Sequence, residues 1–257
     1  MSSALAIETS DLRKAFGDLV AVDGIDLAVP RGSFYGFLGP NGAGKSTTIK
    51  CLTGLIRPTS GTYRILDLDA IAQPVEVKRR IGVVPEDLAL FDRLSGAETL
   101  AFVGQVHGLD AASVRGRSAE LLTLMDLTRA KDDLVADYSH GMRKKIALAA
   151  ALLPAPRLLF LDEPFEGVDA VASRQIRDLL AHFVKGGGTV FLTSHILEIV
   201  DRLCDHIGII SKGRLVAQGP IAELRGAPGS GKTLEERFFE LVGADTTSAP
   251  ALDWLSR

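Results

Sequence analysis

Short runs dominated by apolar residues recur along this chain of 257 residues. Three of them lie at residues 33–38 (SFYGFL), 158–161 (LLFL) and 189–193 (TVFLT). Continuous apolar runs, rather than strict alternation with polar residues, are typical of strands that are buried on both faces of a parallel sheet. The pattern therefore predicts a mostly parallel sheet that includes these three strands.

Apolar residues that recur every three or four positions predict helices. In residues 48–55 this spacing turns Ile49, Leu52 and Leu55 toward a core. We therefore expect a helix here, shortly after the first strand.

Three further helices are predicted, each from a signal at its start. Ser139 is a candidate N-cap for a helix with a strong apolar face that runs through residue 153. Pro220 precedes a short helix at residues 221–225. A polar start followed by apolar positions predicts an amphipathic helix at residues 234–242.

The string GPNGAGKS, residues 39–46, lies between the first strand and the first helix. It fits the Gly-x-x-x-x-Gly-Lys-Ser/Thr pattern of a phosphate-binding loop. Its glycines allow a sharp turn and a close approach of the backbone to a ligand. Lys45 can reach the β- and γ-phosphates of a nucleotide, and the Ser46 hydroxyl can ligate Mg²⁺. The order of strand, loop and helix makes this string a functional candidate.

A second string, GAPGSGKT at residues 226–233, fits the same pattern. It follows the short helix at residues 221–225 instead of a buried strand, and only 24 residues remain after Thr233. That length is too short for another α/β sheet. The sequence therefore predicts one nucleotide site and assigns this second string to a linker.

Acidic residues end the second predicted strand. Asp162 and Glu163 follow it directly, at the end of a parallel strand where ligands bind. Asp162 can hold Mg²⁺, and Glu163 can orient or deprotonate an attacking water. Two solvated acids are the alternative, and the presence of Lys45 and Ser46 argues against it. His195, after the third strand, can reach the γ-phosphate if this strand lies beside the acidic one.

The start of the helix after Ser139 allows two interpretations. Its first turn presents Ser and Gly N–H groups that suit an anion. A serine in this place is equally a plain helix cap. The residues alone leave both interpretations open.

Charge and composition narrow the class of partner. The net charge is −3, with Lys and Arg spread along the chain, and this argues against nucleic acid as a partner. The basic runs at residues 78–80 and 143–145 are interpreted as solvated faces. Cys51 and Cys204 are predicted to be buried. The longest apolar stretch, residues 146–153, is far shorter than the ~20 residues that cross a bilayer, so we expect a soluble chain.

Five motifs occur in a fixed order: GPNGAGKST, YSHGM, LLFLDEP, EGVD and TSH. Together they span most of residues 1–220 and resemble the ATPase subunit of an ATP-binding-cassette (ABC) transporter. The resemblance implies an α/β fold of the P-loop NTPase class. It has a mixed sheet core, an N-terminal antiparallel β portion that includes residues 61–66, and a helical subdomain at about residues 87–150. It also implies an ABC ATPase domain at residues 1–225, followed by a linker, a short helix and a tail at residues 226–257.

The resemblance implies roles for single residues. Phe16 resembles the aromatic residue that stacks on adenine, Glu163 the catalytic base, and His195 the switch residue. Asp169 resembles the acid of the loop that joins two subunits. The ATP-binding residues of the phosphate loop are Gly39, Pro40, Asn41, Gly42, Ala43, Gly44, Lys45, Ser46 and Thr47.

The signature segment of the family corresponds here to Ser139, His140 and Gly141. In the family this segment touches the γ-phosphate of ATP that a partner subunit holds. The resemblance therefore favours phosphate binding at this helix start, across an interface.

The chain departs from the family's commonest pattern in three places. The usual Leu-Ser-Gly-Gly-Gln is YSHGM, in which His140 adds bulk and a titratable ring. Glu86 stands where a Gln is usual, and it is expected to approach Mg²⁺ or the water as a third metal ligand beside Ser46 and Asp162. Residues 166–169 read EGVD instead of Ser-Gly-Leu-Asp. This combination is similar to a subset of exporter ATPases whose membrane-spanning protein is a separate polypeptide.

These features predict an ATP-binding and ATP-hydrolysing subunit that uses ATP and Mg²⁺ to power a separate permease, an exporter, by ATP-driven head-to-tail dimerisation. Its partners are a second copy of itself or a paralogous ATPase subunit, and the permease. Leu88, Leu90 and Phe91 are candidate anchors for the permease, with burial in the core as the alternative for each. The expected location is cytoplasmic, at the inner face of the cell membrane. The alternative function is a soluble ABC-type ATPase in a non-transport complex.

Overall fold

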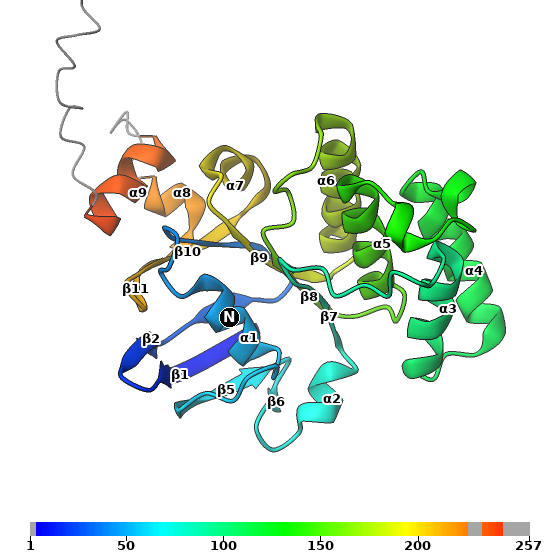
Figure 1. Cartoon of the computed structure of the whole chain (residues 1–257). Coiled ribbons are helices and arrows are strands. Elements are labelled where there is room, and N and C mark those ends of the chain that lie inside the picture. Colours follow the sequence, from blue (N-terminus) through cyan, green and yellow to red (C-terminus); the bar gives the residue numbers. More distant parts are fainter. Residues whose placement is uncertain (1–3, 226–232, 244–257) are drawn as a thin grey trace, which may run out of the picture.

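The computed structural model describes residues 4–225 and 233–243. The predicted linker at residues 226–232 and the predicted tail at residues 244–257 lie outside the described residues. The described part contains two sheets, with helices around the larger one (Figure 1).

The larger sheet has six strands in the order β11-β10-β4-β9-β8-β7. All neighbours are parallel except β10 and β11. Their bounds are β4 Phe34–Leu38, β7 Ile81–Val84, β8 Leu158–Asp162, β9 Thr189–Ser194, β10 His206–Ser211 and β11 Arg214–Pro220. The three predicted strands are β4, β9 and β8, and every residue in them is buried. The expectation that the strand before His195 neighbours the acidic strand is confirmed, because Asp162 pairs with Thr193.

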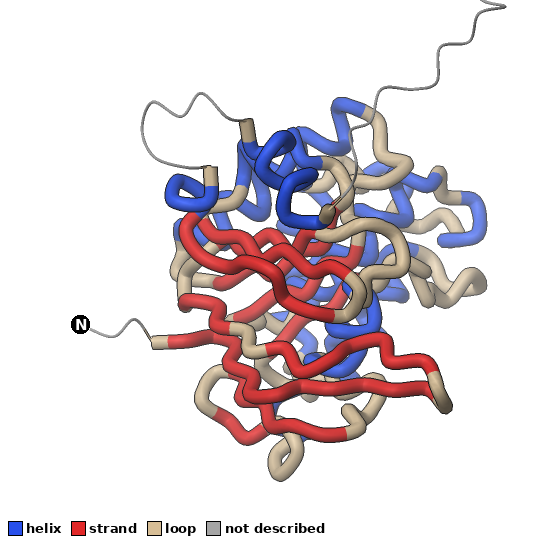
Figure 2. Tube along the Cα trace, turned by 90° about the vertical axis from the view of Figure 1, so that its left-hand side faces the viewer, coloured by secondary structure: helices blue, strands red, loops and turns tan. Residues whose placement is uncertain are grey.

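The smaller sheet is antiparallel and comes from the N-terminal part of the chain, as predicted. Its strands are β1 Leu5–Phe16, β2 Leu19–Ile25, β3 Ala28–Pro30, β5 Ser60–Ile65 and β6 Leu68–Asp69. Figure 2 shows the strands gathered together, with helices above and behind them.

Nine α-helices and two 3₁₀ turns lie within the described residues. The α-helices are α1 Lys45–Leu52, α2 Pro74–Lys78, α3 Gly96–Val106, α4 Ala111–Leu124, α5 His140–Leu152, α6 Ala170–Lys185, α7 Leu197–Leu203, α8 Ile221–Leu224 and α9 Leu234–Val242. The 3₁₀ turns are Thr128–Ala130 and Val135–Asp137. In Figure 1, α3, α4 and α5 (green) lie together at the end of the molecule away from β1 and β2.

Alternate residues of the central strands point to opposite faces of the larger sheet, and each face has its own core. On one face Phe191 stacks on Tyr35, with ring centroids 5.5 Å apart, and it also contacts Phe37 and Phe160. This core includes residues of the smaller sheet and of α1. The core on the other face includes residues of α5, α6 and α7. The sheet is therefore covered on both sides, as continuous apolar strands require.

Two predictions about local structure are wrong. The first helix starts at Lys45, inside the phosphate loop, and ends at Leu52, so Leu55 lies beyond it and is 61% exposed. A turn at Gly54, with φ of +67°, separates Leu55 from the helix. The basic run at residues 143–145 is not a solvated face, because Lys144 and Lys145 are buried.

The other basic run behaves as predicted at its first two positions, since Lys78 and Arg79 are exposed. Cys51 and Cys204 are both free thiols in the core, as expected. Burial raises the pKa of the Cys51 thiol to about 11. Such thiols are inert packing groups.

Candidate nucleotide site

The phosphate loop connects the end of β4 to the start of α1. Lys45 is the first residue of α1 and is only 7% exposed. Its Nζ donates hydrogen bonds to the carbonyl oxygens of Gly39 at 2.8 Å and Pro40 at 3.3 Å. Two backbone carbonyls thus hold the ammonium inside the loop.

Gly44 is required by the geometry of the loop. Its φ is +108°, and a Cβ at this position would lie 2.4 Å from the carbonyl oxygen of Ala21 in β2. The neighbouring carbonyl of Ala43 accepts from the amide of Gly213, and the carbonyl of Gly213 accepts from the amide of Asp23. The loop is therefore joined on one side to β2 and to the β10–β11 turn.

The acidic strand end is tied to the neighbouring strand by Thr193. The Thr193 hydroxyl donates to Asp162 Oδ1 at 2.5 Å and accepts from the Glu163 amide at 3.0 Å. Both acids are buried, with Asp162 2% and Glu163 6% exposed. The Glu163 carboxylate lies 3.9 Å from Lys45 Nζ and 3.0 Å from His195 Nδ1. The structure thus brings together three of the residues that the sequence singled out.

Glu163 has an unusual backbone conformation. Its φ of +47° lies in the left-handed region, which costs a residue with a side chain about 1–2 kcal/mol. Its carbonyl accepts a hydrogen bond of 2.7 Å from Lys144 Nζ, which is 3% exposed. Burial lowers the pKa of Lys144, and the carboxylates of Glu166, Glu163, Glu86 and Asp162 partly oppose this. Such conformations persist where surrounding contacts hold them, and they cluster at functional sites.

A cavity of about 510 Å³ lies over the loop. Its walls contain ten of the predicted site residues: Phe16, Asn41, Gly42, Gly44, Lys45, Ser46, Thr47, Glu86, Glu163 and His195. They also contain Leu19 and Ala21, which the sequence had not indicated, and Glu166, to which it had given no role in the site. Gly39, Pro40, Ala43 and Asp162, which the sequence also singled out, do not line the cavity. The volume is in the range of sites for ligands of nucleotide size.

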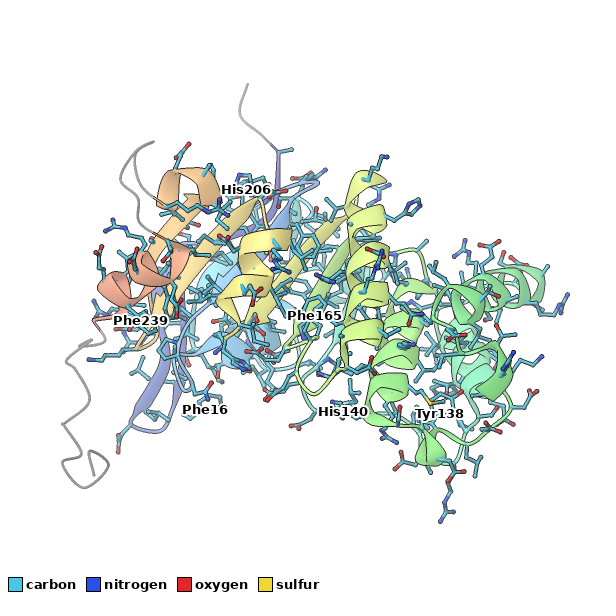
Figure 3. The ribbon with its side chains drawn as sticks, turned by 90° about the horizontal axis from the view of Figure 1, so that it is seen from above. Phe16, Tyr138, His140, Phe165, His206 and Phe239 are labelled. Atoms are coloured by element: carbon cyan, nitrogen blue, oxygen red, sulfur yellow. The ribbon has the colours of Figure 1, made fainter. Side chains whose placement is uncertain are left out.

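Phe16 forms one end of this cavity. It ends β1, is 49% exposed, and has Lys14 Nζ 4.8 Å from its ring centroid. Figure 3 shows Phe16 and His140 along the same edge of the molecule, well separated from each other. An exposed aromatic face with a nearby cation suits stacking by a base.

The signature segment does not line this cavity. Ser139 is exposed and is the N-cap of α5, and its hydroxyl accepts from the Met142 amide at 3.2 Å. Asp169 caps α6 in the same way and lies close to Gly141, where a Cβ would be 3.6 Å from Asp169 Oδ2. Hydrogen bonds from the amides of residues 171 and 172 hold the pKa of the Asp169 carboxyl below its usual value.

A second concavity, of about 430 Å³, lies between β7, α3 and α5 and is mostly apolar. Leu88, Leu90 and Phe91 line it, and Phe91 is 55% exposed and packs edge-on against Phe102 at 5.0 Å. The Thr99 hydroxyl in its wall is buried and has no hydrogen-bond partner within the described residues. We call this concavity the β7 groove.

The sequence analysis gave three contributors no role in the site: Thr193 and Glu166, which lie within the TSH and EGVD motifs, and Lys144. Thr193 is a polar residue at the end of a buried strand that was expected to lie beside the strand ending in Asp162. That position could have indicated a contact with the acidic residues. Lys144 lies within a basic run, and its burial depends on a carbonyl 19 residues away along the chain. Nothing local indicates that contact.

This chain is similar to a known protein family and to several of its members. The model described as ABC transporter matches residues 22–166. The daunorubicin/doxorubicin resistance ATP-binding protein DrrA of Streptomyces peucetius is 44% identical over 88% of this chain and 68% of its own length. The linearmycin resistance ATP-binding protein LnrL of Bacillus subtilis (strain 168) is 37% identical over 85% of this chain and 70% of its own.

Solved structures give the same result. An ATP-binding subunit of an ABC transporter is 31% identical, with a TM-score of 0.84, over 93% of this chain and 99% of its own. A dimeric ATP-binding cassette in a post-hydrolysis state, bound to ADP and Pi, is 23% identical with a TM-score of 0.77, over 86% of this chain and 100% of its own, and supports the fold. Within the described residues, no helix combines the length and apolar character needed to span a membrane. The phosphate loop, the acidic strand end and these matches lead to one conclusion: the chain belongs to the ABC transporter family, as an ATP-binding subunit.

Proposed function

We propose that this chain binds and hydrolyses ATP as one of two head-to-tail subunits that power a separate export permease. The observation that carries the proposal is the separation of two half-sites. Lys45, Glu163 and His195 surround one cavity, whereas Ser139 presents the exposed start of α5 elsewhere. A nucleotide in the cavity would need a second subunit to bring a signature segment to its γ-phosphate.

Each part of the nucleotide has a matching group. Backbone amides of the loop and the Lys45 ammonium bind the phosphates, and Phe16 stacks on the adenine. Glu163 takes a proton from the attacking water, while His195, 3.0 Å from its carboxylate, fixes the orientation of that carboxylate. Positioning and charge stabilisation supply most of the rate enhancement in phosphoryl transfer.

Mg²⁺ fits the oxygen ligands at this site. Ser46 and Glu86 both line the cavity, and Asp162 is buried directly before Glu163. Hydroxyl and carboxylate oxygens are the ligands that Mg²⁺ prefers. When bound, the ion would neutralise charge on the phosphates.

A mixing experiment tests the head-to-tail arrangement. One chain carries Lys45→Ala, which removes phosphate binding. The other carries Ser139→Asp, which keeps a helix cap but sets a negative charge against the phosphate. Each chain alone is expected to be inactive. The mixture is expected to regain part of the wild-type ATPase activity, at most about a quarter, because no more than half the dimers would be mixed and each mixed dimer has one intact site of two.

The control for this mixture is Ser139→Thr, which keeps both the hydroxyl and the cap and is expected to remain active. The head-to-tail arrangement would be contradicted if the mixture stayed inactive although each variant chain is folded and still pairs with a wild-type chain.

The β7 groove is proposed as the site for a short helix of the permease. The groove is mostly apolar, and Phe91 and Phe102 extend the apolar surface to the outside. An amphipathic helix would cover this surface and place one polar group against Thr99. The relatives named as resistance ATP-binding proteins support a transport partner.

Phe91→Ser is expected to lower about tenfold the fraction of the protein that sediments with membranes of its own cells. The substitution removes the burial of an apolar side chain, which contributes about 1.5–3 kcal/mol to binding. ATPase activity of the isolated chain should not change, because Phe91 is not in the nucleotide cavity. The matched control is Val216→Ser, an exposed apolar residue of β11 at the opposite edge of the sheet. Equal losses for the two variants would contradict docking in the groove.

The partner subunit is either a second copy or a paralogous ATPase subunit, and the permease would hold the pair at the inner face of the cell membrane. The alternative of a soluble ATPase in a non-transport complex is not favoured. An ATPase that acts on nucleic acid needs an exposed basic surface. Two of the three residues in the basic run at 143–145 are buried, so this run does not supply one.

A further inference from the structure

The loop at residues 163–169 carries groups of the nucleotide site but has little regular structure of its own. Glu163 and Glu166 line the cavity, and Asp169 begins α6. Two residues have positive φ, Glu163 at +47° and Gly167 at +66°. A loop in this conformation depends on contacts from outside to keep its shape.

Two side chains of α5 supply such contacts. Lys144 Nζ donates to the Glu163 carbonyl at 2.7 Å, and His140 Nε2 lies 3.3 Å from the Glu166 carbonyl oxygen. Because a carbonyl oxygen only accepts, the His140 Nε2 carries the proton in this contact. Residues 140 and 144 are one helical turn apart, so both side chains lie on the same face of α5.

The fit around His140 is close. A Cβ on Gly167 would lie 3.0 Å from both Cδ2 and Nε2 of the imidazole, so the ring covers this glycine. Lys144 is nearly fully buried, which lowers its pKa, and the negative charges of Glu166 and Glu163 partly oppose this by favouring the ammonium form. Polar contacts thus join the first turns of α5 to the backbone carbonyls of two residues of the loop, Glu163 and Glu166.

The same helix start carries Ser139, which the proposed function places on the nucleotide of the partner subunit. One end of α5 therefore faces the partner's nucleotide, while its side chains hold the acidic loop of its own subunit. We propose that His140 and Lys144 are positioning residues that transmit nucleotide contact at Ser139 to Glu163, so that nucleotide bound at one site speeds hydrolysis at the other. This inference rests on the proposed head-to-tail pair.

The first test uses steady-state ATPase kinetics of the full chain. His140→Ala is expected to lower kcat about tenfold, with little change in KM, because alignment is lost and nucleotide binding is not. The Hill coefficient for ATP should fall to about 1, because coupling between the sites is lost. His140→Gln, whose amide can donate to the same carbonyl, is expected to recover most of kcat. Lys144→Met should show a larger loss in kcat of the same kind.

The matched control is Arg143→Met on the same helix. Arg143 bonds to Asp92 and to the carbonyl of Val135, away from the loop. Its kcat and Hill coefficient are expected to stay at wild-type values. Hydrogen exchange gives a readout independent of activity: amides of residues 164–168 should exchange faster in His140→Ala and Lys144→Met than in Arg143→Met.

A second experiment separates this inference from the proposed function. In a Glu163→Gln background, His140→Ala is expected to leave ATP-dependent dimerisation intact. If Glu163→Gln alone fails to dimerise, the head-to-tail function fails. If it dimerises but His140→Ala keeps wild-type kcat and Hill coefficient, or if the double variant no longer dimerises, the positioning role is wrong and the function stands.

Discussion

Glu163→Gln is expected to lower the ATPase rate about a thousandfold, the scale of a lost general base. The amide keeps the shape of the side chain but cannot take the proton of the attacking water. It also removes a buried negative charge that lies 3.9 Å from Lys45 Nζ. ATP should therefore bind at least as well, and the closed pair should accumulate.

Size-exclusion chromatography with ATP is the measurement for this variant. The 27.4 kDa chain should elute at twice its mass with ATP and at its own mass with ADP. Glu166→Gln is the matched control, since Glu166 lines the same cavity but contacts His140 through its backbone carbonyl. Wild-type turnover by Glu163→Gln, or a monomer at millimolar ATP, would remove Glu163 from the role of base.

Lys45→Ala is expected to weaken ATP binding about a hundredfold, because a hydrogen bond from a charged donor contributes about 3 kcal/mol to binding. The ammonium sits 2.8 Å from a loop carbonyl and would exchange this contact for phosphate oxygens. Isothermal titration with ATP measures the change. Thermal unfolding without nucleotide should show that the loop variant remains folded.

Lys232→Ala makes the same substitution in the second glycine-rich string, which the sequence analysis assigned to a linker. Its ATP affinity is expected to equal that of the wild type. Equal losses at Lys45 and Lys232 would mean that both strings bind nucleotide, and the single-site interpretation would be wrong.

The segments that could be predicted from sequence are those whose signals are local. The strands β4, β8 and β9 are continuous apolar runs, and the structure buries every residue in them. The helix α9 matches its predicted bounds, and a capping box between Thr233 and Glu236 marks its start. Local signals of this kind need no knowledge of the rest of the fold.

The features that were missed depend on contacts between distant parts of the chain. The burial of Lys144 is tolerated because the Glu163 carbonyl accepts a hydrogen bond from its ammonium. The backbone of Glu163 turns left-handed within an otherwise ordinary acidic strand end. Thr193 becomes important only when β9 lies beside β8. Leu55 was misplaced because the turn at Gly54 ends the helical spacing early. Tertiary geometry, not residue type, decides each of these cases.

The close packing at Gly44 links changes in the shape of β2 to changes in the phosphate loop. A Cβ at Gly44 would lie 2.4 Å from the carbonyl oxygen of Ala21 in β2, and Gly213 hydrogen-bonds both to the phosphate loop and to β2. The cavity wall at Phe16 and Leu19 and the phosphate loop therefore share one backbone junction. With Phe16 on the base, as proposed above, substitutions that reshape the turn between β1 and β2 are expected to move the phosphate loop as well, so that preference for the base and affinity for the triphosphate change together.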